Sequence, residues 1–118
     1  MGCILLESKQ LVEKIVAFME EKKAKDISVI NIQDITIISD YFVICSGTST
    51  THIKAIADEV QFKLKEIGIE ANHSEGYETA RWILLDYSDV IIHVFHHEDR
   101  SFYNLERLWS DGVMTNYR

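Results

Sequence analysis

The chain has 118 residues, 47% of them hydrophobic, and this predicts one compact domain spanning residues 1–118. Charged residues make up 26% and proline is absent, which is typical of a folded globular protein and excludes a disordered or fibrous chain. No apolar run approaches the ~20 residues that span a bilayer, so we expect a cytoplasmic protein without membrane contact. The net charge of −7 opposes contact with phosphate backbones, so little direct nucleic-acid binding is expected.

Acidic and aromatic residues are concentrated in the second half of the chain. Residues 70–118 hold nine acidic side chains, only four basic ones, all arginine, and eight of the twelve aromatic residues. Arginine with Trp and Tyr, in the absence of lysine, is typical of a protein–protein interface, although aromatic residues are as often found in a core. The composition leaves both interpretations open.

The first half predicts a helix followed by two strands. Apolar residues recur at helical spacing from Leu11 to Met19, with Ser8 as the candidate N-cap. The segments Asp26–Ile32 and Tyr41–Cys45 are rich in β-branched and apolar residues and predict strands, the second one buried on both faces. The two cysteines form no Cys-x-x-Cys pair, so a buried thiol at the end of the second strand is expected and no disulfide.

The rest of the chain predicts a second helix, a hairpin and a final helix. The helix covers about Thr51–Ile67, and the strands Trp82–Leu85 and Val90–His96 are joined by a tight turn and are therefore antiparallel. A final helix is expected to begin near Ser101 and to end at Asp111. The predicted fold class is α/β (α+β), a single domain with a mixed β-sheet and flanking helices.

The most enzyme-like segment is the turn Ser46–Thr51, where a glycine and several hydroxyls precede a helix and could cradle a phosphate. It matches neither of the glycine-rich phosphate-binding patterns Gly-x-x-x-x-Gly-Lys-Ser/Thr and Gly-x-Gly-x-x-Gly. Ser and Thr are also ordinary N-caps of helices. A nucleotidyltransferase would also need paired acids on a following strand to hold magnesium, and Trp82–Leu85 carries none. We therefore expect no enzyme activity and no cofactor.

A histidine cluster raises the possibility of a metal site. His93, His96 and His97 are followed by Glu98 and Asp99. On a strand, the first and third histidines share a face but lie ~13 Å apart, while the second points to the other face. Three ligands do not converge without a bend, so no metal is expected.

Three segments together resemble one known family. They are Ser39–Ser49 (SDYFVICSGTS), Trp82–Phe95 (WILLDYSDVIIHVF) and Arg100–Trp109 (RSFYNLERLW). In this combination they are similar to the ribosomal silencing factor, or Iojap, family, and the resemblance extends over essentially the whole chain. It implies a fold like that of nucleotidyltransferases without their activity. The alternative is a catalytically degenerate nucleotidyltransferase-like domain that binds nucleotides.

The resemblance also implies a function and partners. It implies a factor that binds the large ribosomal subunit through ribosomal protein number fourteen at the intersubunit face. There it blocks association with the small subunit and represses translation, especially under nutrient limitation. The charge of the chain agrees, because an acidic factor would bind an RNA-rich particle through a basic protein patch. Relatives of this family also imply a possible homodimer.

The candidate contact residues lie in two segments. Around the predicted hairpin they are Trp82, Asp86, Tyr87 and Asp89, and at the start of the final helix they are Glu98, Asp99, Arg100 and Tyr103. Each has a structural alternative. Trp82 and Tyr103 would also suit a core, the two hairpin aspartates a turn, and Asp99 a helix cap.

Overall fold

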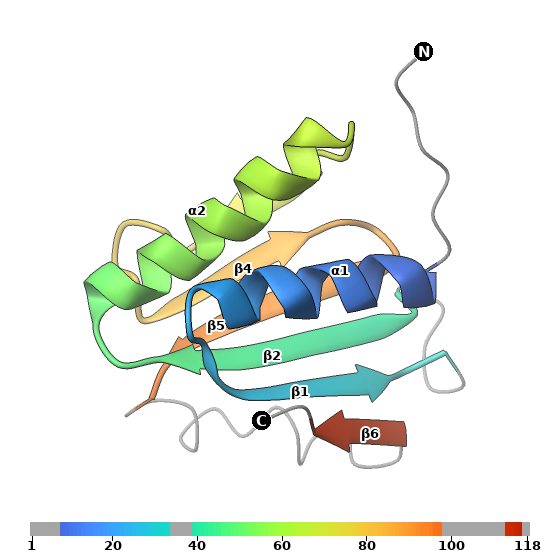
Figure 1. Cartoon of the computed structure of the whole chain (residues 1–118), viewed down its shortest axis with the longest axis horizontal. Coiled ribbons are helices and arrows are strands. Elements are labelled where there is room, and N and C mark those ends of the chain that lie inside the picture. Colours follow the sequence, from blue (N-terminus) through green and yellow to red (C-terminus); the bar gives the residue numbers. More distant parts are fainter. Residues whose placement is uncertain (1–7, 34–38, 98–112, 117–118) are drawn as a thin grey trace.

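In the part of the chain that the structure describes, two helices lie against one face of a six-stranded sheet (Figure 1). The structure is a computed structural model, and it describes residues 8–33, 39–97 and 113–116. The elements in chain order are α1 (Ser8–Glu21), β1 (Lys25–Asn31), β2 (Tyr41–Gly47), α2 (Thr50–Glu66), β3 (His73–Glu75), β4 (Trp82–Asp86), β5 (Val90–His96) and β6 (Val113–Asn116). This confirms the predicted α+β class.

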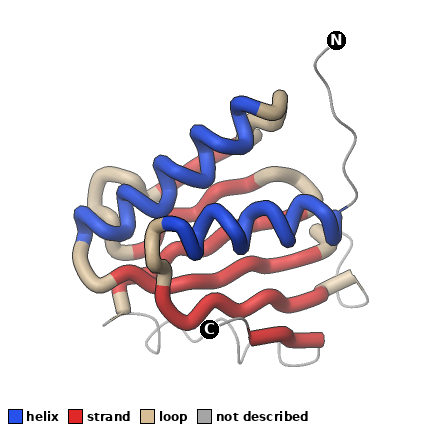
Figure 2. The backbone as a smooth tube through the Cα atoms, in the orientation of Figure 1, coloured by secondary structure: helices blue, strands red, loops and turns tan. Residues whose placement is uncertain are grey.

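The sheet is mixed, as predicted. Its strand order is β3-β4-β5-β2-β1-β6, with both helices on the same side (Figure 2). The central strands β2 and β5 are parallel, while the other four pairs are antiparallel. The crossover between β2 and the parallel β5 contains α2, which packs on the sheet. The predicted hairpin is the antiparallel pair β4–β5.

The first two predicted helices are present as α1 and α2, and each buries its apolar stripe against the sheet. The buried side chains of α1 extend from Leu11 to Met19, as the periodicity predicts. Ser8 is the first residue of α1, and its hydroxyl donates a 2.5 Å hydrogen bond to the carboxylate of Asp40, which ties the helix to the segment before β2. At α2, Ser49 is the N-cap and accepts a 3.1 Å hydrogen bond from the backbone N–H of His52.

The core has two parts, one on each face of the sheet. The helix-side cluster includes Val43 and the buried thiol of Cys45, which confirms the expected burial of this cysteine. A smaller cluster occupies the opposite face and includes Phe42 and Ile44. Because successive residues of β2 alternate between these clusters, the strand is buried on both faces, as its continuous apolar run predicts.

Two strands are missing from the sequence-based prediction. The short β3 is exposed at all three residues, so it has no apolar alternation to reveal it. The segment Val113–Asn116 follows the predicted final helix and pairs with β1 as β6. The final helix itself, from Ser101 to Asp111, lies outside the described residues.

Candidate functional site

The β4–β5 hairpin places its residues on two faces by simple alternation. Ile83 and Leu85 of β4 are buried on the helix side, whereas Trp82, Leu84 and Asp86 lie on the opposite face and are half-buried. The antiparallel register sets these three opposite Phe95, His93 and Ile91, in that order. Of these β5 residues, only Ile91 is half-buried. We call Trp82, Leu84, Asp86 and Ile91 the hairpin patch.

The side chain of Trp82 is half-buried and packs against the smaller core cluster. Its ring stacks on that of Phe95, with a centroid separation of 5.1 Å, and its indole Nε1 donates a 3.0 Å hydrogen bond to Nδ1 of His93. These contacts fix the orientation of the ring, while half-burial leaves part of it accessible. A rigid, partly exposed tryptophan is the kind of side chain that anchors protein–protein contacts.

His93 is a buried polar residue of this face. It is 4% exposed and packs edge-on against the ring of Phe42. Burial lowers the pKa of His93 to about 4, since a charged imidazolium would lose its hydration there. The imidazole is therefore neutral at physiological pH, and it supports Trp82 as a hydrogen-bond acceptor.

The turn of the hairpin uses Asp86 and Asp89 in different ways. The carboxylate of Asp86 accepts a 2.8 Å hydrogen bond from the backbone N–H of Ser88, so this side chain shapes the turn. Asp89 acts through its backbone carbonyl, which accepts hydrogen bonds from Asp40 and Tyr41 at 2.8 and 3.1 Å. The carboxylate of Asp89 forms no hydrogen bond with another described residue, and Asp89 is exposed.

Acidic groups border the hairpin patch. Glu75 of β3 lies opposite Leu84 in the sheet register and is exposed, and Asp89 supplies a second exposed carboxylate at the turn, while Asp86 of the patch itself supplies a third. Sequence reasoning missed Leu84, Ile91 and Glu75. Strand alternation signals the first two, but Glu75 joins the surface only through the pairing of β3 with β4. An apolar centre with an acidic border suits a partner with a basic surface.

The other predicted contact residues are not part of the hairpin patch. Tyr87 is 6% exposed and packs in the helix-side core, on the other side of the sheet from Trp82. The structure therefore separates these two aromatic residues, although they are only five positions apart. Glu98, Asp99, Arg100 and Tyr103 lie outside the described residues.

The turn before α2 is built for capping and packing. The backbone N–H of Thr48 donates a 3.0 Å hydrogen bond to Nδ1 of His52, whose Nε2 lies 2.7 Å from the carbonyl oxygen of Lys22. A Cβ atom at Gly47 would lie 2.8 Å from Cγ1 of Ile53, so the glycine permits close packing of the strand end against the helix. These contacts give the turn a structural role.

The described residues contain neither a metal-binding cluster nor a membrane-spanning helix. Within residues 8–33, 39–97 and 113–116, no three His, Cys, Asp or Glu side chains are grouped in a way that would hold a metal ion. His93 and His96 lie on opposite faces of β5. A helix long and apolar enough to cross a membrane is also absent from these ranges.

Comparison with known proteins agrees with this architecture. The family model described as "Ribosomal silencing factor during starvation" matches residues 6–117. A ribosomal silencing factor from Halalkalibacterium halodurans is 42% identical over 107 residues, which cover 91% of this chain and 92% of that protein. A crystal structure of a protein from Chromobacterium violaceum superposes with a TM-score of 0.87 at 33% identity and covers 89% of this chain and 88% of that one.

A more distant relative comes from mitochondria. The mouse protein named "Mitochondrial assembly of ribosomal large subunit protein 1" is 31% identical over 102 residues, which cover 84% of this chain and 45% of that protein. The family model spans nearly the whole chain, and the bacterial relative matches along almost its full length. The chain therefore belongs to the ribosomal silencing factor family, whose names indicate a ribosome-associated regulator.

Proposed function

We propose that this protein binds the large ribosomal subunit through ribosomal protein number fourteen at the intersubunit face and blocks association with the small subunit. In this way it represses translation, especially under nutrient limitation. Family membership supports the silencing role, and the family description names starvation. The name of the mouse relative refers to the large subunit. The proposed action is binding in the cytoplasm, without catalysis or a cofactor.

The observation that carries the proposal is the hairpin patch. Together with its acidic border, the patch combines a half-buried tryptophan with the carboxylates of Glu75, Asp86 and Asp89, in a chain of net charge −7. Ribosomal proteins that bind RNA are basic, so a surface of this kind is complementary to one of them and not to the RNA itself. We propose that Trp82 is the apolar anchor and that the carboxylates guide the encounter.

The remaining candidates extend this proposal. Glu98, Asp99, Arg100 and Tyr103 are proposed as further contacts to the same partner. The backbone N–H of Tyr87 donates a 2.9 Å hydrogen bond to the carbonyl oxygen of Val90, and this bond helps to close the turn of the hairpin. A homodimer is proposed as a second association of the free protein that uses part of the aromatic surface.

The test is a sedimentation and subunit-joining experiment with purified ribosomal subunits. The wild-type protein is expected to sediment with the large subunit and to reduce joining. Asp89→Lys is expected to weaken both effects without unfolding, because Asp89 contributes to the turn only through its backbone. Glu13→Lys makes the same charge change at an exposed position of α1, on the other side of the sheet, and is the matched control.

The outcomes separate the site from the function. Failure of the wild-type protein to sediment with the large subunit would contradict the function itself. Normal binding by Asp89→Lys would contradict the acidic border as a contact. The association rate should also fall as ionic strength rises, because salt screens exposed charges beyond ~8 Å at physiological concentration.

A further inference from the structure

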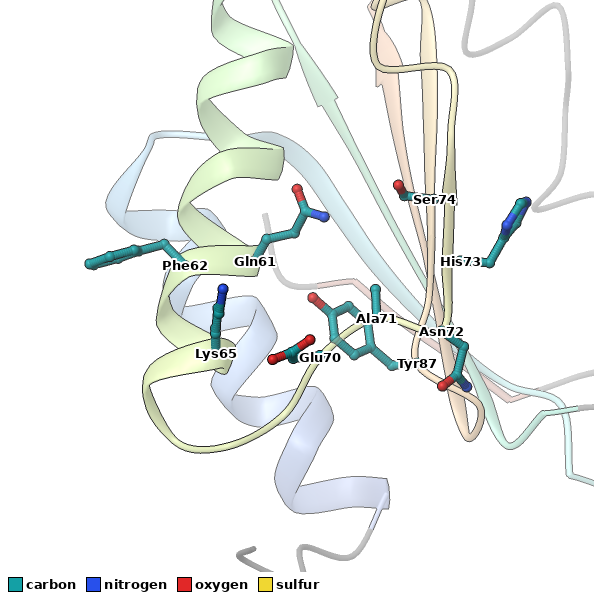
Figure 3. A pocket seen from close by; sticks show the side chains of 9 residues that line it. All are labelled: Gln61, Phe62, Lys65, Glu70, Ala71, Asn72, His73, Ser74 and Tyr87. Carbon is teal, nitrogen blue, oxygen red and sulfur yellow. The ribbon is translucent and has the colours of Figure 1, made fainter. Parts of the chain in front are cut away.

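A concave site lies on the helix side of the sheet, between the C-terminal half of α2 and the edge strand β3. Its volume is about 650 Å³, within the range of small-molecule sites. The side chains that line it come from α2, from the segment that follows it, from β3 and from the end of β4 (Figure 3). None of the residues of the hairpin patch lines this pocket, so it is a separate site.

The hydroxyl of Tyr87 is the polar group that this pocket leaves unsatisfied. Tyr87 is 6% exposed, and its hydroxyl oxygen is buried without a hydrogen-bond partner among the described residues. The ring extends from the end of β4 toward α2, and the hydroxyl faces the pocket (Figure 3). A buried hydroxyl without a partner costs free energy, so a ligand that supplies the partner gains binding energy at this position.

The ionisation state of this hydroxyl is also defined. Burial, together with the nearby carboxylate of Glu70, raises the pKa of Tyr87 to about 12. The hydroxyl therefore stays protonated at physiological pH and can both donate and accept a hydrogen bond.

The pocket is lined by charged groups of both signs. Gln61 and Lys65 are four residues apart on α2, so the amide and the ammonium group share one face of the helix. Glu70 lies on the segment after the helix, beside Tyr87. Among the described residues, no ion pair is formed by Lys65 or Glu70, so both charges are available to a ligand. Two further lining residues are already engaged, since His73 contacts Glu75 and the amide of Asn72 donates to Ser88.

We propose that this pocket binds a small zwitterion of the α-amino-acid type. The ligand's carboxylate contacts the Lys65 ammonium and the Gln61 amide on α2, and its ammonium group lies between the Glu70 carboxylate and the Tyr87 hydroxyl oxygen. A simple anion would be repelled by Glu70 and a simple cation by Lys65. A ligand with both charges can pair with Lys65 and with Glu70, and it can also supply a hydrogen-bond partner to the Tyr87 hydroxyl.

The experiment is a titration of the full chain with free amino acids, first pooled and then singly at millimolar concentration, followed by backbone amide NMR. Shifts are expected at the amides of Gln61, Lys65, Glu70 and Tyr87 and not at the hairpin patch. N-acetylated amino acids and inorganic phosphate, which lack the ammonium group, are expected to cause no shifts at these positions. Absence of shifts with every amino acid, or equal shifts with the N-acetylated forms, would overturn the proposal.

Variants test the assigned contacts. Tyr87→Phe removes only the hydroxyl, so it should weaken binding tenfold or more while the melting temperature stays the same or rises. Glu70→Gln and Lys65→Gln, both at exposed positions, should also weaken binding. Lys63→Gln is the matched control on α2, because Lys63 does not line the pocket.

Two results would contradict these contacts. A fall in melting temperature for Tyr87→Phe would show that the hydroxyl is already satisfied, for example by an ordered water. Unchanged affinity in Tyr87→Phe, Glu70→Gln and Lys65→Gln would show that the amino acid binds elsewhere. Loss of large-subunit binding is not expected in Glu70→Gln or Lys65→Gln, so these two variants test the pocket independently of the function proposed above.

Discussion

The indole Nε1 of Trp82 donates a 3.0 Å hydrogen bond to Nδ1 of His93, and this contact defines the state of a buried histidine. Because Nδ1 accepts, the proton of the neutral ring lies on Nε2, which has no partner among the described residues. Protonation of Nδ1 would replace an acceptor with a second donor. The exposed part of the hairpin and the buried face of the sheet are thus linked through one ionisable side chain.

Stability should therefore depend on pH through His93. Its pKa is 6.5 in the unfolded chain and about 4 in the folded one, so the unfolded state binds the proton more readily. The stabilisation that comes from keeping His93 neutral is complete above pH 6.5. As the pH falls toward 4, the free energy of unfolding should decrease by about 3 kcal/mol. His93→Gln keeps an acceptor for Trp82 but does not titrate. Chemical denaturation of the wild type and of His93→Gln gives the free energy of unfolding at each pH. The two values should converge or cross at low pH, and a difference that stays constant with pH would contradict the pKa shift of His93.

Two substitutions at Trp82 separate its structural and binding roles. Trp82→Phe keeps a ring against Phe95 but loses the donor to His93, so it should cost about 1 kcal/mol of stability. Trp82→Ala should cost about 2–3 kcal/mol of stability, because the ring is half-buried. If Trp82 is the proposed anchor, the folded fraction of the alanine variant should also bind large subunits roughly thirtyfold more weakly. Thermal melts and sedimentation on the same samples measure both, and unchanged affinity of the folded fraction would remove Trp82 from the contact.

Substitutions at Asp86 distinguish its charge from its turn contact. Asp86→Asn keeps an oxygen that accepts from the N–H of Ser88 but removes the charge, whereas Asp86→Ala removes both. The alanine variant should lose about 1 kcal/mol of stability and the asparagine variant much less. A slower association of Asp86→Asn with large subunits would assign the carboxylate to the contact. Wild-type association by this variant would leave Asp86 with the turn alone.

Gly76 should tolerate no side chain. Its φ is +85°, and a Cβ atom there would clash with the carbonyl oxygen of Trp82. Gly76→Ala combines an unfavourable φ with a backbone clash and should cost about 3 kcal/mol or more. The exposed Gly68 has a similar φ of +87°, so Gly68→Ala reports the conformational cost of about 1 kcal/mol. Equal losses in the two variants, measured by denaturant unfolding, would show that the loop at Gly76 moves to avoid the clash.

The variant Ser88→Gly should be more stable than the variant Ser88→Ala. Its φ is +69°, a region that favours glycine, and its hydroxyl accepts a hydrogen bond from the amide of Asn72. Both substitutions lose that bond, but only glycine relieves the backbone. The free energy of unfolding of Ser88→Gly should therefore be about 1 kcal/mol higher than that of Ser88→Ala. Equal stabilities would show that the turn relaxes when the Asn72 contact is lost.

The sequence by itself determined the elements that have a strong local signal. Apolar spacing from Leu11 to Met19 predicts a helix and its buried stripe, and the continuous run in β2 predicts burial on both faces. The turn residues between β4 and β5 predict an antiparallel hairpin. These signals are local, since periodicity and turn chemistry act over a few residues. Three matching segments also identified the family.

Only the tertiary structure decided which residues share a surface. β3 is exposed along its length and exists because it pairs with β4, and β6 exists because it pairs with β1, so neither has a strong local signal. The pairing of β3 with β4 brings Glu75 next to Leu84. The sequence predicted Trp82 and Tyr87 as one contact group, but the hairpin sends them to opposite faces of the sheet. Which side chain faces a partner and which one lines a pocket depends on long-range strand pairing and helix packing, and neither is encoded in a short segment of the chain.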